Sequence, residues 1–445
     1  MRQQATAGAL YQWLMSICPD FLVEIRYRSV SGTRDVLPEE QPYWRFIEKK
    51  IAEITALFGY QRVDPPIFEE TPLFIRGVGE TTDIVEKEMY SFLDKGKTAL
   101  TLRPEFTAGV MRLYLQNGLH MLSKPVKLYS VGPVFRFERP QAGRFRQHTQ
   151  FNVEALGEQD PAIDLEVMSV AWQLYAELGF ADLAFQLNST GCPQCRPHYI
   201  EILKAYYREH LHETCEDCKR RLERNALRLL DCKVAGCQPV IASAPVISEH
   251  LCAECDSHFS ALTGFLRGLG RPYVINHKLV RGLDYYTKTV FEVWAKGIGA
   301  QNAMCGGGRY DGLIEQLGGD PTPGIGFGSG IERIILSMKE QGLAPDPLPA
   351  PQILVAHAGA AAKAAAVEVV FRLRDHRIGA LMAFGERSLK SQMREANRLN
   401  AGVVIIIAEQ ELEAQTLTVK DLRDGSQAEI PAAGLIEHIK AKGLR

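Results

Sequence analysis

The residues with the clearest chemical use in this sequence are arginines concentrated in one short segment. The four are Arg136, Arg139, Arg144 and Arg146. Alternating apolar residues lead into the segment from Val131 and out of it to Gly157, around a proline- and glycine-containing loop beside one acid, Glu138. This pattern predicts a long antiparallel hairpin with the arginines near its loop. Because a guanidinium pairs with phosphate through two charge-assisted bonds, the loop suits a polyphosphate; a solvated basic turn is the alternative.

The strand that leaves this loop carries polar residues at every second position. Gln150, Asn152 and Glu154 alternate with Phe151 and Val153. Successive side chains of a strand point to opposite faces, so the three polar residues are expected to share one face of the sheet. A polar row beneath a cationic loop favours the floor of a binding site over a solvated turn.

Composition narrows the class of protein. The 445 residues carry a formal net charge of −2, which excludes bulk cationic binding of nucleic acid and leaves only local contacts. A hydrophobic share of 46% is typical of a soluble globular protein of about two to four domains. No apolar run reaches the roughly 18 residues that a membrane span needs, so no membrane partner is expected. Eight of the ten cysteines fall between Cys192 and Cys255, and without a secretory signal this indicates reduced thiols or metal in the cytoplasm.

Apolar periodicity predicts the elements that position these residues. Helical spacing from Trp44 to Phe58 predicts a helix over 42–58 that stops at Gly59. The next segment, 62–68, is expected to be one strand that its prolines confine to an edge or an interface, and helix and strand together are a candidate dimer surface. Further expected elements are a short helix at 10–21, a strand at 100–105, helices at 107–117 and 160–178, strands at 279–284 and 289–294, and a strand entering a helix at 323–335. From 353 to 407, alternating strands and helices predict a compact α/β domain with a largely parallel sheet.

Two further stretches have a chemical reading. Glycines alternate strictly from Gly324 to Gly330, which is not the spacing of a dinucleotide fingerprint but leaves a flat groove where a planar ring can lie. Arg333 follows in the first turn of the expected helix, a position that suits an anion; a tight strand–helix packing joint is the alternative. Arg281 precedes the pair Tyr285-Tyr286, and an arginine in such an apolar setting needs an anion.

Together these stretches resemble a known family. FRFERPQAGRFRQHTQFNVE at 135–154 resembles motif 2 of the class II aminoacyl-tRNA synthetases, GIGFGSGIERII at 324–335 resembles their motif 3, and the helix and proline-containing strand at 42–68 resemble motif 1. LVRGLDYY at 279–286 and GGGRYD at 306–311 are similar to the two histidine-specific signatures of the histidyl-tRNA synthetases, and TLRPE at 101–105 completes the match. The resemblance runs from about Ser31 to the C-terminus.

The resemblance implies an α+β fold: a class II antiparallel sheet with flanking helices, a helical insertion, and a C-terminal α/β domain like the family's anticodon-binding domain. The expected boundaries are an N-terminal extension at 1–28, a first catalytic part at 29–187, a cysteine-rich helical insertion at 188–275, a second catalytic part at 276–342, a linker at 343–351 and the C-terminal domain at 352–445. A cytoplasmic homodimer is expected.

The implied activity is adenylation of L-histidine by ATP with Mg²⁺, then transfer of the histidyl group to tRNA(His). Arg136 and Arg281 are the expected catalytic residues, because fixed cations stabilise the negative charge that builds at the α-phosphate. The residues expected at ATP are Arg136, Glu138, Arg144, His148, Gly328 and Arg333. Those expected at histidine are Glu105, Phe106, Thr107, Arg136, Gln150, Glu154, Arg281, Tyr285, Tyr286 and Tyr310. The family expectation is a contact between the hairpin loop, near Arg139 and Arg146, and the acceptor stem of the tRNA.

The cysteines suggest a structural metal. Cys192, Cys195, Cys215 and Cys218 have the spacing of a zinc ribbon, which leaves Cys232, Cys237, Cys252 and Cys255 for a second site. Buried reduced thiols are the alternative, and neither reading gives the cysteines a catalytic part. The rival to the enzyme as a whole is a histidine-sensing regulatory paralogue of an ATP phosphoribosyltransferase, and the retained arginines and C-terminal domain argue against it.

Overall fold

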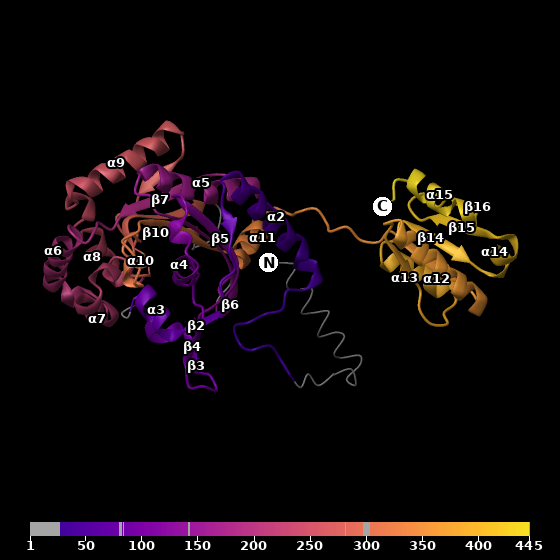
Figure 1. Cartoon of the computed structure of the whole chain (residues 1–445), viewed down its shortest axis with the longest axis horizontal. Helices are drawn as coiled ribbons and strands as arrows, with labels where there is room; N and C mark the ends of the chain where they lie inside the picture. Colours follow the sequence, from indigo (N-terminus) through magenta and orange to yellow (C-terminus); the bar gives the residue numbers. More distant parts are fainter. Residues whose placement is uncertain are drawn as a thin grey trace. The chain divides into compact units, whose positions relative to one another are not determined.

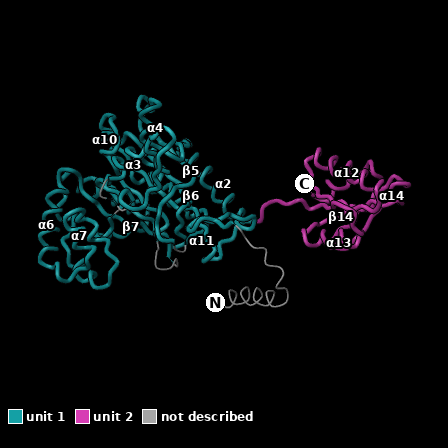
Figure 2. The backbone as a smooth tube through the Cα atoms, turned by 90° about the horizontal axis from the view of Figure 1, so that it is seen from below, with its two compact units in different colours: residues 1–346 teal, residues 347–445 magenta. Residues whose placement is uncertain are grey.

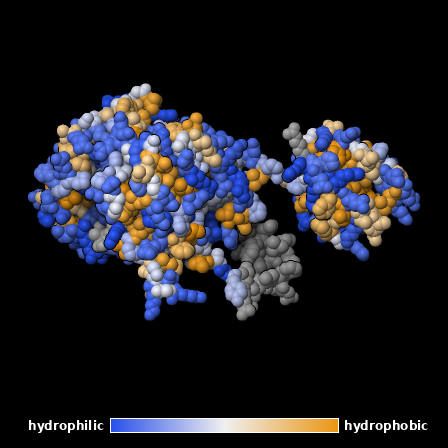
Figure 3. Space-filling model, viewed as in Figure 1, coloured by the Kyte–Doolittle hydropathy of each residue, from blue (hydrophilic) through white to orange (hydrophobic). Residues whose placement is uncertain are grey.

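A computed structural model describes residues 27–79, 82, 84–140, 143–280, 282–296 and 303–444 of the chain. The chain forms two compact units, Met1–Asp346 and Pro347–Arg445, which Figure 2 shows in two colours. The expected helix at 10–21 and Arg281 lie outside the described residues. Within the described ranges, no helix is long and apolar enough to cross a membrane. The face drawn in Figure 3 mixes hydrophilic and hydrophobic residues over both units.

The first unit is built on a large, mostly antiparallel sheet, in agreement with the predicted fold class. In the described chain this sheet has eight strands in the order β1-β5-β6-β11-β10-β9-β7-β8, and only its edge pairs β1–β5 and β7–β8 are parallel. The strands are β1 (Gln61–Arg62), β5 (Val126–Phe135), β6 (Gln147–Leu156), β7 (Leu183–Ser189), β8 (Tyr273–Ile275), β9 (Thr287–Ala295), β10 (Ala303–Arg309) and β11 (Gly324–Gly330). β5 and β6 form the predicted hairpin, which is therefore confirmed.

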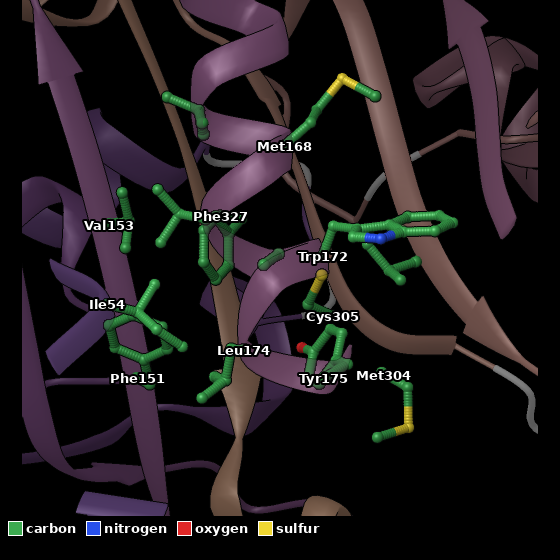
Figure 4. Packing of buried hydrophobic residues seen from close by; sticks show 14 of the residues in the cluster. Ile54, Phe151, Val153, Met168, Trp172, Leu174, Tyr175, Met304, Cys305 and Phe327 are labelled. Carbon is green, nitrogen blue, oxygen red and sulfur yellow. The ribbon is translucent and has the colours of Figure 1, made fainter. Parts of the chain in front are cut away.

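Helices cover one face of this sheet and make the main core with it (Figure 1). They are α2 (Gln41–Leu57), α5 (Pro161–Glu177), α9 (Ala253–Gly268) and α11 (Ile331–Glu340). Figure 4 shows Trp172, Leu174 and Tyr175 of α5 in the same packed cluster as the sheet residues Phe151 and Phe327. α5 begins at the predicted cap, because the Asp160 side chain accepts from the Ala162 N–H at 2.8 Å.

Two predicted strands of the first unit are wrong in detail. The segment 62–68 is not one strand: β1 ends at Arg62, and β2 (Phe68–Glu70) joins a separate small sheet with β4 (Ala99–Leu102) and β3 (Tyr90–Leu93). The prolines between β1 and β2 cannot donate to a ladder, so the chain changes sheets there. The described residues of the expected strand at 279–284, which are 279–280 and 282–284, do not form a strand; the Asn188 side chain of β7 donates to the Leu279 carbonyl at 3.0 Å.

The opposite face of the sheet carries a second apolar cluster around α4 (Thr107–Gln116), which confirms the helix predicted there. α3 (Thr71–Val78) and α10 (Leu313–Gln316) lie nearby. Short helical turns complete the described chain: η2 (Pro38–Glu40), the π-helical η3 (Ile84–Glu88), η4 (Leu119–Met121), η5 (Leu211–Glu213), η6 (Ala226–Leu229), η7 (Ala235–Cys237), η8 (Ile247–Glu249) and η9 (Ala432–Gly434). This second face holds the candidate site.

A helical insertion leaves the sheet after β7 and returns through α9 to β8. Its own helices are α6 (Arg196–Glu209), α7 (Glu216–Arg224) and α8 (Gln238–Ala242), around a separate apolar cluster. β7 and β8 pair within the large sheet, so the helical part is shorter at both ends than the expected 188–275.

The second unit is a five-stranded sheet in the described residues, ordered β13-β12-β14-β15-β16. Its elements are β12 (Ile353–His357), α12 (Ala360–Asp375), β13 (Ala380–Met382), α13 (Leu389–Arg398), β14 (Val403–Ile407), α14 (Glu409–Ala414), β15 (Thr416–Asp421), β16 (Gln427–Pro431) and α15 (Leu435–Ala441). The first three strands pair in parallel as predicted, whereas β15 and β16 add antiparallel strands, so the sheet is mixed rather than largely parallel.

Candidate active site

The floor of the site is formed where β6, β11 and β10 lie side by side. Gln150, Asn152 and Glu154 stand opposite Gly330, Gly328 and Gly326 on β11, and Gly328 and Gly326 stand opposite Gly306 and Gly308 on β10. Cross-strand partners lie on the same face of a sheet, so the predicted polar row lies beside two rows of glycines. The other face of β6 carries Phe151 and Val153 into the core.

The glycines leave room for the site's own side chains. A Cβ at Gly326 would lie 2.1 Å from Oε2 of Glu154, and one at Gly328 would lie 2.4 Å from Nε2 of Gln150. At Gly324 it would lie 2.4 Å from the Tyr310 ring. The alternating glycines predicted a groove for a planar ligand, but not that they make room for the side chains of the site itself. At Gly330 an added Cβ meets nothing closer than 3.9 Å, so space remains at that end of the strand.

Glu154 lies at the centre of a buried hydrogen-bond cluster. Its Oε1 accepts from the Thr107 hydroxyl at 2.7 Å and from the Asn152 amide at 2.6 Å, and its Oε2 accepts from the Tyr310 hydroxyl. Burial raises the pKa of Glu154 to about 8, although these three donors oppose the shift. A carboxyl that titrates near neutral pH in a polar pocket is a common feature of functional sites.

Glu105 supplies a second buried carboxyl at the start of α4. It accepts backbone N–H groups of Thr107 and Ala108 at 2.5 and 2.8 Å, donors that a helix start leaves unpaired. Burial raises the pKa of Glu105, whereas these N–H groups and the charge of Arg136 lower it. Phe106, between the two predicted polar residues, is buried in the apolar cluster below.

Three tyrosines close the apolar side of the pocket. Tyr285 lies with its ring centroid 4.8 Å from that of Tyr286 and 5.6 Å from that of Tyr310, and all three are buried. The structure thus brings Tyr310, from the end of β10, to the pair on the loop before β9. Arg281 lies outside the described residues, so its place in the site stays a prediction.

The hairpin arginines differ in how they are held. Arg136 donates from Nε to the Pro104 carbonyl at 2.8 Å, which orients its guanidinium beside the pocket. Glu138 faces Arg144 at 3.3 Å. Arg146 stacks 3.9 Å from the Phe137 ring and donates to the carbonyls of Ser31 and Glu138, so it fixes the loop in the described structure. Arg139 is exposed.

Two further residues predicted to bind ATP, His148 and Arg333, lie where the hairpin meets α11. His148 is bonded through Nδ1 to the Phe145 carbonyl at 3.2 Å, and burial with the charge of Arg136 lowers the pKa of His148 to about 4. The ring is therefore neutral at pH 7. Arg333 occupies the first turn of α11, as predicted. Its neighbour Glu332 accepts the Thr149 N–H with both oxygens at 2.9 Å and joins α11 to β6, a contact that sequence reasoning missed.

Sequence reasoning also missed two arginines that support the pocket. Arg103 donates to the carbonyls of Pro65 and Pro133 at 2.7 and 2.8 Å and lies 4.1 Å from the Phe106 ring. Arg309 is fully buried and pairs with Asp164 at 2.7 Å and with Asp311 at 2.9 Å. Arg103 lies in the TLRPE stretch and Arg309 in the GGGRYD stretch. The sequence signal that could have indicated them was an arginine among apolar or glycine residues.

The cysteines form two groups, but the predicted grouping is wrong. Cys192 and Cys195 meet Cys252 and Cys255, whereas Cys215 and Cys218 meet Cys232 and Cys237. The first group joins the start of α6 to the start of α9, where the insertion leaves and re-enters the sheet. Spacing alone pairs neighbours along the chain, while the helical path of the insertion brings its two ends together.

Two family descriptions match the chain, one in each unit. A family described as "Histidyl-tRNA synthetase" matches residues 32–334, and one described as "Anticodon binding domain" matches residues 352–442. The chain is 51% identical to a histidine–tRNA ligase of Dehalococcoides mccartyi, over 93% of this chain and 99% of that one. It is 48% identical to a histidine–tRNA ligase of Moorella thermoacetica, over 92% and 97%. The crystal structure of apo S. aureus histidyl-tRNA synthetase superposes with a TM-score of 0.78 at 36% identity, covering 93% of this chain and 100% of that one.

The antiparallel sheet, the arginine-bearing hairpin and the glycine strand entering α11 define a class II aminoacyl-tRNA synthetase. The chain belongs to the histidyl-tRNA synthetase family.

Proposed function

We propose that this chain is a histidine–tRNA ligase that activates L-histidine with ATP and transfers it to tRNA(His). The observation that carries the proposal is the buried cluster of Glu154 with Thr107, Asn152 and Tyr310, beside the hairpin arginines. An imidazole needs partners for both ring nitrogens, and this cluster offers a carboxyl and a phenol within an apolar wall. The relatives at 51% and 48% identity carry the same activity in their names.

The amino end of histidine is assigned to Glu105, Thr107 and Gln150. Oε1 of Gln150 is buried, and none of the described residues donates a hydrogen bond to it. A buried acceptor without a partner costs about 1–3 kcal/mol, which a substrate ammonium group recovers. The imidazole is assigned to Glu154, Tyr285 and Tyr286, with Tyr310 closing the pocket.

The first chemical step is attack of the histidine carboxylate on the α-phosphate of ATP, which forms histidyl-adenylate and breaks the bond to the β-phosphate, so that pyrophosphate leaves. Mg²⁺ would be bound with the ATP. The carboxylate is already ionised at pH 7, so this step needs no general base. Negative charge grows at phosphorus, and Arg136 and Arg281 are assigned to stabilise it from two sides. Arg144 and Arg333 would hold the outer phosphates. Glu138 would accept from the adenine amino group, with His148 stacked on the ring and Gly328 beneath it.

Transfer to tRNA involves both units. The C-terminal unit matches an anticodon-binding domain, and exposed Arg139 on the hairpin is assigned to the acceptor stem. A homodimer is supported by large apolar side chains that remain exposed around α2, β2 and η4. They are Leu57, Ile67, Phe68, Met121 and Leu122. A subunit interface would cover such exposed apolar side chains.

The test is exchange of pyrophosphate into ATP with each of the twenty amino acids, without tRNA. We expect exchange with histidine only, because a site whose buried polar groups need this substrate rejects analogues that lack them. Arg136→Ala should abolish exchange, and the matched Arg139→Ala should keep it while weakening tRNA charging. Histidine binding without exchange would instead identify the regulatory paralogue, which the named relatives do not favour.

A further inference from the structure

The insertion contains two clusters of cysteine sulfurs at metal-binding distances. In each group of four, the sulfurs all lie within 4.8 Å of one another. Neighbouring sulfurs are 3.8 Å apart for Cys192 and Cys252, 3.9 Å for Cys195 and Cys255, and 3.8 Å for Cys215 and Cys232. A disulfide would place them about 2.0 Å apart. A tetrahedron with Zn–S bonds of about 2.3 Å places them about 3.8 Å apart.

We propose that each group holds one zinc ion through four thiolates, and that the ion nearer the sheet positions the histidine pocket. The site of Cys192, Cys195, Cys252 and Cys255 is called the base site, and that of Cys215, Cys218, Cys232 and Cys237 the distal site. Four sulfur ligands without a water position make both ions structural rather than catalytic.

The backbone around both groups is arranged for sulfur. The N–H of Cys192 donates to the sulfur of Cys195 at 3.3 Å, and that of Cys215 donates to the sulfur of Cys237 at 3.2 Å. Such bonds from backbone N–H groups to the sulfurs stabilise thiolate charge. Gly191 has a φ of +66°, and a Cβ there would lie 2.9 Å from the sulfur of Cys195. A side chain at 191 would therefore disturb the base site.

The two ions have different structural tasks. The base site links the chain just after β7 to the start of α9, so it closes the insertion at its root. The distal site lies within the small apolar cluster of α6, α7 and α8. A core of that size usually needs a metal or disulfides to fold, because it buries little surface.

The base site reaches the pocket through Arg196, the residue after Cys195. Arg196 donates to the carbonyls of Thr190 and Gly191 at 2.8 and 3.0 Å, and also to the carbonyl of Tyr286. Arg196 is thus a positioning residue that ties the tyrosine loop to the base site. The distal part also contacts the tyrosine loop, because the Asn225 amide donates to the Asp284 carboxylate at 2.7 Å, but this bond is exposed. Its pair of Arg224 with Glu86 of η3, at 3.3 Å, has an arginine side chain that is 68% exposed and contributes little.

The first experiment counts zinc in the full chain, purified under reducing conditions and reconstituted anaerobically with zinc. We expect two ions per chain. Cys192→Ser with Cys252→Ser should remove one ion, and Cys192→Ser with Cys215→Ser should remove both; a grouping of neighbours along the chain predicts the reverse. Cys305→Ala, outside both groups, should keep two. Wild-type chain that binds no zinc, or the reverse pattern of losses, would overturn the proposal.

Cobalt substitution of the unmodified chain gives a test that needs no variant. Two Co²⁺ ions per chain with thiolate charge-transfer bands and tetrahedral d–d absorption are expected. Octahedral spectra would contradict four-sulfur coordination. Folding of each variant is followed by circular dichroism.

The second experiment concerns positioning and rests on the proposed function. Loss of the base ion, and separately Arg196→Ala, should raise KM for histidine in pyrophosphate exchange about tenfold, with KM for ATP changed less. Arg196→Ala should still hold two zinc ions, and Arg196→Lys should recover part of the affinity. Equal effects of base and distal variants on KM for histidine would refute the link. Absence of exchange by the wild-type chain would refute the proposed function while leaving the zinc count to stand by itself.

Discussion

Replacing Glu154 by Gln tests the assignment of the imidazole pocket. A carboxylate has about four acceptor positions. Thr107, Asn152 and Tyr310 occupy three of them, which leaves one for an N–H of the substrate ring. A glutamine offers one acceptor oxygen, so it loses the charged bond to the ring and leaves a donor of the cluster unpaired. A hydrogen bond to a charged group contributes about 1.5–3 kcal/mol, so kcat/KM for histidine should fall about 10- to 150-fold.

The same residue sets the pH dependence of histidine use. Burial raises the pKa of Glu154 to about 8, so in the free enzyme the carboxyl is mostly protonated at pH 7. The ionised form is the one that accepts the ring N–H, and kcat/KM for histidine should therefore rise with pH until about 8 and then level off. In the Glu154→Gln variant this rise should disappear.

Histidine-dependent pyrophosphate exchange between pH 6 and 9 measures both effects. Glu166→Gln is the matched control, because Glu166 pairs with Lys127 at 2.7 Å away from the pocket and its side chain is 31% exposed. An exposed pair of this kind contributes about 0–1 kcal/mol, so the control should stay close to wild type. A Glu154→Gln variant with wild-type kcat/KM and an unchanged pH profile would refute the pocket assignment.

Three further predictions concern stability and domain roles. Gly326→Ala should lower the melting temperature of the chain, because the added Cβ would lie 2.3 Å from the Val153 carbonyl. Gly330→Ala is the control and should keep the wild-type melting temperature, because its Cβ would meet nothing closer than 3.9 Å. Equal melting temperatures of the two variants would contradict this. Arg309→Met should lower the free energy of unfolding in urea by about 3–5 kcal/mol, because it leaves buried Asp164 without its guanidinium; a loss below about 1 kcal/mol would show that the pair is not needed. A chain ending at Asp346 should retain histidine-dependent exchange and lose tRNA charging, and it keeps Leu343, which packs against the main core. Charging that survives this truncation would remove the anticodon role from the second unit.

The sequence alone predicted those features that depend on local periodicity and on caps. The hairpin of β5 and β6, the shared face of Gln150 and Glu154, and the start of α5 at Asp160 all follow from side-chain alternation or from a single hydrogen bond near in sequence. Motif resemblance supplied the family and the fold class, which the comparisons confirmed. The roles of the individual site residues stay predictions.

Contacts between distant segments were decided only by the tertiary structure. The bond of Tyr310 to Glu154, the pairing of Arg309 with Asp164 and the grouping of Cys192 with Cys252 join residues that no local pattern relates. Which residues come into contact across such distances depends on the path of the folded chain between them. Spacing along the chain therefore predicted two groups of four cysteines, whereas the helical path of the insertion determined which cysteines share a group.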